Sequence, residues 1–160
     1  MLLEYFHQLK GGIMEKFEKV LFALDFSDNS EHAFDYALSM AKNFNARLII
    51  IHVIQEPVDL SGFYVPHISF ENLEKEIKDG AERMMEKFCA KMITGFSDYE
   101  TAVVAGIPYQ EILRKAGEEN VSLIVMGTQG RRGIDHILFG SNAERVVRNA
   151  KCPVLTVRLP

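Results

Sequence analysis

The segment Lys19-Val20-Leu21-Phe22-Ala23-Leu24-Asp25 is a short apolar run that ends in an acidic residue, and Phe26-Ser27-Asp28-Asn29-Ser30 follows it directly. An apolar run followed by residues that favour turns and helix N-caps is typical of a buried strand leading into a helix. Apolar residues then recur at helical spacing between Ala33 and Phe44, with charged residues off that stripe. The next run, Arg47–Val53, is almost continuously apolar, which indicates a strand covered on both faces. The segment therefore begins a β-α-β unit.

The rest of the chain continues this alternation. We expect a surface loop over 55–69 and then a long amphipathic helix whose inward face carries Phe70, Leu73, Ile77, Ala81, Met84, Phe88 and Met92. After it the patterns predict a strand from Tyr99 to Val104, a helix beginning at Pro108, a strand over 123–126, a helix over 142–149 and a strand over 154–157. This order predicts an α/β fold, a five-stranded parallel sheet with helices on both faces in a Rossmann-like or flavodoxin-like three-layer arrangement.

Length and composition agree with one globular domain. The chain has 160 residues, of which 48% are hydrophobic, enough apolar material for a single core. Residues 14–160 are predicted to form that domain. Residues 1–13 are expected to be an N-terminal extension or the product of a misplaced start, with Met14 as the true first residue.

Charge and cysteine usage exclude several classes of protein. A net charge of −4 argues against a nucleic-acid-binding protein, because neutralising phosphates requires a basic face, although basic residues outnumber acidic ones from residue 127 onward. Cys89 and Cys152 are too few for a disulfide framework and no Cys/His spacing suggests zinc, so a reducing, cytoplasmic compartment is expected. Neither an export signal nor a membrane-spanning apolar stretch is predicted.

The glycine-rich segment after the fourth predicted strand is the most informative about function. It runs Gly127-Thr128-Gln129-Gly130-Arg131-Arg132-Gly133, and Gly140-Ser141-Asn142-Ala143 follows at the start of the last helix. Gly127 and Gly130 permit positive φ and leave room for phosphates beside backbone N–H groups, while a helix N-terminus attracts anions. Together, at the carboxyl end of a strand, these features predict a phosphate clamp. The alternative is that each glycine only shapes a loop, and neither a P-loop nor a G-x-G-x-x-G pattern occurs.

The spacing Gly127-x2-Gly130-x9-Gly140-Ser141 resembles the nucleotide-binding signature of the universal stress protein family. Other segments are similar to further parts of that family: Val20–Ser27 to its first strand and acidic turn, Ile51–Val53 to its second strand, Gly106–Pro108 to the exit of its third strand, and Cys152–Val157 to its last strand. The resemblance extends from about residue 16 to residue 158. It implies the adenine-nucleotide-alpha-hydrolase-like version of the predicted fold.

The resemblance also implies a site for ATP with Mg²⁺ or Mn²⁺. By resemblance, the loop holds the ribose and phosphates through Gly127, Thr128, Gln129, Gly130, Arg131, Arg132 and Gly133. The triphosphate lies at the start of the last helix, on Gly140, Ser141, Asn142 and Ala143. Val53 offers its backbone to adenine, Ala23 lies beside the base, and Asp25 lies near the ribose or a phosphate-bound divalent ion.

Two questions about these residues stay open at this stage. Asp25 either contacts the ligand or only caps the turn that follows it. No Ser-His-Asp constellation or general base is evident, so no catalytic residue is assigned, and slow or partner-stimulated ATP hydrolysis remains open.

The predicted function is a nucleotide-gated stress-response regulator or signalling module. Bound ATP is expected to order residues 127–143 and change a surface that an unidentified protein partner binds. One alternative is a slow ATP hydrolase or another nucleotide-dependent enzyme of a related fold, and a second is a nucleotide-free adaptor or chaperone. The resemblance further implies a homodimer paired through the terminal strand, Val154–Val157.

Overall fold

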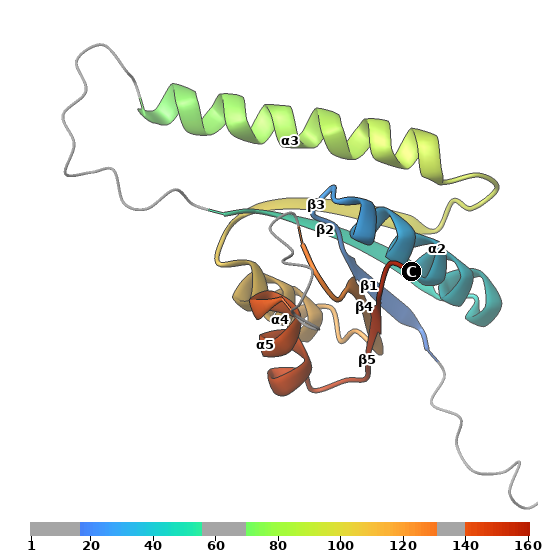
Figure 1. Cartoon of the computed structure of the whole chain (residues 1–160). Coiled ribbons are helices and arrows are strands. Elements are labelled where there is room, and N and C mark those ends of the chain that lie inside the picture. The colour runs from blue at the N-terminus through green and yellow to red at the C-terminus, as the bar shows by residue number, and fades with distance from the viewer. Residues whose placement is uncertain (1–16, 56–69, 131–139) are drawn as a thin grey trace, which may run out of the picture.

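The computed structural model describes residues 17–55, 70–130 and 140–160. Strands and helices alternate along the chain (Figure 1). In chain order they are β1 (Lys19–Ala23), α2 (Asp28–Phe44), β2 (Arg47–Gln55), α3 (Phe70–Met92), β3 (Tyr99–Gly106), α4 (Pro108–Glu118), β4 (Leu123–Gly127), α5 (Ser141–Asn149) and β5 (Val154–Val157). No helix in these ranges combines the length and apolar character needed to cross a membrane.

The strands form one parallel sheet in the order β3-β2-β1-β4-β5, which confirms the predicted fold class. Helices α2 and α3 pack on one face of the sheet and α4 and α5 on the other, so that the molecule has three layers (Figure 1). Alternate residues of the central strands enter the two cores, Phe22 on the side of α2 and Leu21 on the side of α4 and α5. The sheet is thus covered on both faces, as the apolar strands predicted.

Helix ends follow the local chemistry of the sequence. The Ser27 hydroxyl caps α2 by accepting the Ser30 N–H at 3.2 Å, and Asn45 ends that helix in the left-handed conformation with φ of 50°. Pro108 occupies the first turn of α4, as predicted, where its missing N–H has no intrahelical partner to lose. These local features determine where α2 begins and ends and where α4 begins.

The predicted inward face of α3 is wrong at three positions. Leu73, Ile77 and Met84 are 39%, 40% and 46% exposed. The side chain of Phe70 lies outside the described residues. From Asn72 onward the first buried side chain of α3 is Ala81, and Met85 rather than Met84 enters the core. The reason is the reach of the structure beneath the helix. The C-terminal half of α3 packs on β2, β3 and, through the Phe88 ring, on Phe34 of α2, whereas its N-terminal end extends past the strands (Figure 1).

The strand order changes direction between β1 and β4. From β1 the chain moves outward through β2 to β3, then returns to place β4 on the other side of β1 and β5 beyond it. Parallel sheets bind ligands at such a point, outside the carboxyl ends of the two diverging strands. Residues after Ala23 and after Gly127 meet there, because Ala23 pairs with Met126.

A cluster of ion pairs ties β1 to the C-terminal end of α4. It lies at the end of the sheet where β1 begins, opposite the carboxyl ends of the strands. Glu119 accepts from the Lys115 ammonium at 2.9 Å and from the Lys19 ammonium at 3.0 Å, and its carbonyl accepts from Lys19 at 2.8 Å. The Lys115 and Lys19 ammonium groups lower the pKa of Glu119 from 4.5 to about 2.

Replacing Glu119→Gln should destabilise the fold in a pH-dependent way. Because the pKa of Glu119 is lowered in the folded state, its ion pairs stabilise above about pH 4.5 and lose their effect as pH falls toward 2. Urea unfolding at several pH values should show a gap between wild type and E119Q at neutral pH that closes at about pH 2. Glu118→Gln, which breaks a surface pair with Arg114, is the matched control with a smaller effect. A pH-independent gap for E119Q would contradict this assignment.

Candidate functional site

Asp25 and the glycine segment lie together at the switch point, although they are distant in sequence. Asp25 follows β1 by two residues, and Gly127 ends β4. A Cβ added to Gly130 would lie 2.6 Å from Asp25 Oδ2, so the carboxylate lies directly against the loop backbone. The fold therefore brings these two segments together.

The carboxylate of Asp25 shapes the turn that begins α2. Its Oδ1 accepts the Ser27 N–H at 3.0 Å and the Ser27 hydroxyl at 2.6 Å. The turn-capping alternative is thus correct for Oδ1, while Oδ2 faces Gly130 at the edge where a ligand would bind. One side chain thereby joins the start of α2 to the glycine loop.

The conformational reason predicted for the glycines is wrong. Among the described residues, positive φ at glycine occurs at Gly95 and Gly106 and not at Gly127 or Gly130. Both loop positions instead require the absence of Cβ, because protein side chains fill the space: Asp25 at Gly130, and Asn29 at Gly127, where Nδ2 would lie 2.9 Å from an added Cβ. The glycines let two side chains approach the loop backbone, whatever ligand binds there.

The start of α5 packs against the glycine loop. Gly140 is its N-cap and offers no side chain, so the first N–H groups of the helix are not capped from within that residue. The Gly140 N–H donates to the Thr128 carbonyl at 2.7 Å, which holds the helix start against the loop. Ser141 is the first helical residue, one earlier than predicted, and is exposed, whereas Ala143 packs into the core.

Thr128 carries a buried hydroxyl that is a candidate ligand contact. The residue is 6% exposed, and its Oγ1 has no hydrogen-bond partner within the described ranges. Its backbone N–H donates to the Val157 carbonyl at 2.8 Å. A buried hydroxyl without a partner is costly, so a polar group brought to this loop would be stabilised by it.

The other predicted site residues are placed as follows. Ala23 and Val53 are half-buried near the carboxyl ends of β1 and β2, and Gln129 is half-buried in the loop beside the exposed Gly130. Asn142 is half-buried in the first turn of α5. Arg131, Arg132 and Gly133 lie outside the described residues.

A pair of rings in contact, tilted by 51° to each other, lies beside the end of β1. Phe26 adopts a φ of 61°, unusual for a residue with a large side chain, and its ring lies 4.5 Å from the His52 ring, centroid to centroid. His52 Nδ1 is 2.8 Å from the Leu24 carbonyl, so this half-buried histidine has a partner within the protein. The contacts fix the turn between Ala23 and Asp25.

Sequence reasoning missed Asn29. It is 9% exposed in the first turn of α2, and its side chain bonds the loop at Gln129 and the tail at Leu159. In the sequence it stands among residues that favour turns and N-caps, so the pattern offered a local explanation and no sign of a distant partner.

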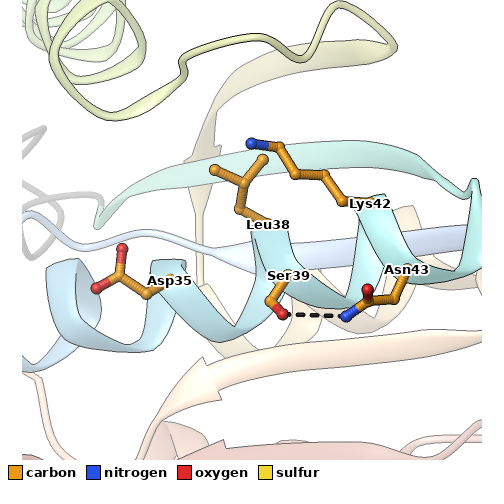
Figure 2. Close-up of a pocket in the computed structure, with 5 residues that line it drawn as sticks. All are labelled: Asp35, Leu38, Ser39, Lys42 and Asn43. Atoms are coloured by element: carbon orange, nitrogen blue, oxygen red, sulfur yellow. Dashed lines mark hydrogen bonds between the residues drawn. The ribbon is translucent and has the colours of Figure 1, made fainter.

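Among the described residues, neither a metal-binding cluster nor a surface hollow provides a competing site. No group of three or more His, Cys, Asp or Glu side chains there could hold a metal ion. A hollow of about 280 Å³ lies on α2, lined by five side chains of that helix alone: Asp35, Leu38, Ser39, Lys42 and Asn43 (Figure 2). The Asn43 amide donates to the Ser39 hydroxyl at 3.2 Å within it. None of the predicted site residues lines it, so it offers no alternative to the switch point.

The family model described as the universal stress protein family matches residues 16–158. The chain belongs to the universal stress protein family. Universal stress protein YxiE of Bacillus subtilis is 37% identical over 147 residues, which cover 89% of this chain and 99% of that protein. Universal stress protein MJ0531 of Methanocaldococcus jannaschii is 36% identical over 146 residues, with 90% of this chain and 84% of that protein covered.

Solved structures of universal stress proteins share the fold. MJ0577 of Methanocaldococcus jannaschii superposes with a TM-score of 0.78 at 29% identity, covering 91% of this chain and 98% of that one. A universal stress protein in complex with cAMP gives a TM-score of 0.61 at 26% identity, covering 89% and 98%. The second structure shows that a relative of this chain binds a nucleotide.

Replacing Gly130→Ala should destabilise the protein by about 1 kcal/mol, because the new Cβ displaces the Asp25 carboxylate and its bonds to Ser27. Gly117→Ala is the matched control: no atom lies within 4 Å of its added Cβ, and alanine should stabilise α4 by about 0.5–1 kcal/mol. Urea unfolding measures both. Equal effects of the two substitutions would contradict the close packing of Asp25 on the loop.

Proposed function

We propose that this universal stress protein binds ATP, with Mg²⁺ or Mn²⁺, and acts as a nucleotide-gated signalling module in the stress response. The observation that carries the proposal is the convergence at one switch point of the Asp25 carboxylate, the loop from Gly127 to Gly130, and the side-chain-free start of α5 at Gly140. Such an arrangement suits a small, strongly negative ligand. A relative whose structure is a complex with cAMP supports an adenine nucleotide as the ligand.

The phosphates, ribose and base of the nucleotide are each assigned to different residues of the site. The phosphates meet the first N–H groups of α5 at Ser141, Asn142 and Ala143, with the positive end of the helix dipole behind them. The Thr128 hydroxyl and the loop backbone of Gly127, Gln129 and Gly130 serve the phosphates and ribose. The same role is proposed for Arg131, Arg132 and Gly133 from the sequence alone. Ala23 and the backbone of Val53 form the side for the base. This chain's part in the chemistry is binding and orientation.

Asp25 suits a nucleotide-bound divalent ion. Mg²⁺ in nucleotide sites is held by one or two carboxylates together with phosphate oxygens and waters, so a full cage of protein ligands is not required. Asp25 supplies one carboxylate whose Oδ2 faces the loop. The bound ion would supply charge compensation for the phosphates.

We also propose a cytoplasmic homodimer that pairs through β5. This strand lies at one edge of the sheet, where β4 is its only neighbouring strand in the described ranges, and Val154, Leu155 and Thr156 are half-buried in the single chain. A second copy across a two-fold axis would cover that edge. Nucleotide binding is proposed to alter a nearby surface to which a protein partner binds.

Replacing Ser141→Asp should separate nucleotide binding from folding. A carboxylate in the first turn favours α5 by about 0.3–1 kcal/mol, yet it repels phosphates and should weaken ATP binding at least about tenfold. Isothermal titration calorimetry measures the affinity. Ser141→Ala, which removes only the hydroxyl, is the control and should change it less than about threefold. If S141D binds ATP like wild type, the phosphates do not lie at the start of α5.

Replacing Leu155→Lys should convert the dimer to a monomer. The aliphatic stem of lysine still covers the core against which Leu155 packs, while the ammonium opposes pairing of two strand edges. Light scattering measures the mass, and circular dichroism establishes that the variant is folded. A monomeric wild type, or a folded dimer of L155K, would contradict pairing through β5.

A further inference from the structure

The side chain of Asn29 joins two segments that lie far from it in sequence. Its Nδ2 donates to the Gln129 carbonyl at 2.7 Å, in the glycine loop. Its Oδ1 accepts the Leu159 N–H at 3.0 Å, two residues beyond the end of β5. With 9% of its surface exposed, Asn29 makes both bonds largely out of contact with water.

The orientation of this amide is determined by its partners. Turned over, the amide would place its oxygen against the Gln129 carbonyl and its NH₂ against the Leu159 N–H, and both bonds would be lost. Gly127 leaves the space that the amide fills, since an added Cβ there would lie 2.9 Å from Nδ2 and 3.2 Å from Cγ. Movement of the loop carbonyl must therefore move Asn29 or break its bond.

A second set of bonds connects the same loop to β5 and to the start of α5. The Thr128 N–H donates to the Val157 carbonyl at 2.8 Å, and the Thr128 carbonyl accepts the Gly140 N–H at 2.7 Å. The glycine loop is thus bonded to α2 through Asn29, to the end of β5 through Val157, and to the start of α5 through Gly140. Among these links the Asn29 amide alone is a side chain, so it can be changed without altering the backbone.

We propose that Asn29 is a positioning residue that ties the glycine loop to the C-terminal segment, so that nucleotide binding and the Leu159 hydrogen bond stabilise each other. This inference rests on the proposed nucleotide function. Coupling between two sites is reciprocal: if the bond to Leu159 improves the position of the loop, a nucleotide that holds the loop strengthens the bond to Leu159 by the same factor. The segment so affected adjoins β5, the edge proposed for the dimer.

Two substitutions break the two bonds separately. Asn29→Asp keeps an acceptor for Leu159 but has no donor for the Gln129 carbonyl, and a new acid in the first turn is compatible with α2. Leu159→Pro removes the donor to Asn29 and adds no charge, and the exposed Leu159 side chain is outside the proposed site. Asn43→Asp is the matched control, because it makes the same change on the exposed part of α2.

The decisive measurement is ATP affinity in wild type, N29D, L159P and the double variant, by calorimetry. Loss of one hydrogen bond that positions the loop should weaken binding about fivefold in L159P, which adds no charge, with N43D unchanged. The loss in N29D should be at least as large, because its carboxylate also repels the Gln129 carbonyl and the phosphates. In the double variant the two effects should not add, because both act through one side chain. Hydrogen exchange of the Leu159 amide should slow when ATP binds to wild type and should not respond in N29D.

The outcomes distinguish the link from the function on which it rests. If wild type does not bind ATP, the proposed function is overturned and the link falls with it. If wild type binds ATP, but L159P binds equally well and the Leu159 amide does not respond, the link alone is overturned. The link is also overturned if the losses of ATP affinity add in the double variant and the exchange rate of the Leu159 amide does not change. Asn29 and Leu159 would then be independent structural contacts.

Discussion

The parallel pairing of β1 with β4 is the constraint on which the rest of the structure depends. It joins strands about 100 residues apart and aligns Val20 with Leu123 through to Ala23 with Met126. Leu21, Phe22, Ile124 and Val125 are fully buried, and a shift of one residue would exchange every side chain between the two cores. Because this register is fixed, Asp25 and Gly130 meet at the same edge of the sheet.

The loop beyond β4 is held by groups from three elements. Asp25 lies against Gly130, Asn29 bonds Gln129, and Thr128 joins both Val157 and Gly140. The glycines of this loop therefore serve the packing of the protein itself, and the close approach of side chains brings backbone donors and a buried hydroxyl to the switch point. A site preorganised in this way lowers the ordering cost of binding.

Periodicity predicted the order of strands and helices and the parallel sheet, because each depends on local patterns and on the handedness of crossovers. It could not predict contacts between segments that are distant in sequence. The inward face of α3 failed at Leu73, Ile77 and Met84, since helical spacing does not indicate where the sheet beneath ends. The positive φ expected at Gly127 was wrong for the same reason: the absent Cβ makes room for Asn29, which comes from α2 and is distant in sequence. Asn29 itself was missed, because it stands among residues that favour turns and helix N-caps.

The family to which the chain belongs and the geometry of the switch point support one central claim, that adenine nucleotide binds where β1 and β4 diverge. Mass spectrometry of the ligand released from the denatured, freshly purified protein tests this claim most directly. The account predicts an adenine nucleotide, up to one per chain, that is depleted when the protein carries Ser141→Asp. Purified protein that releases no nucleotide, and that takes up none when ATP and Mg²⁺ are added before the measurement, would contradict it.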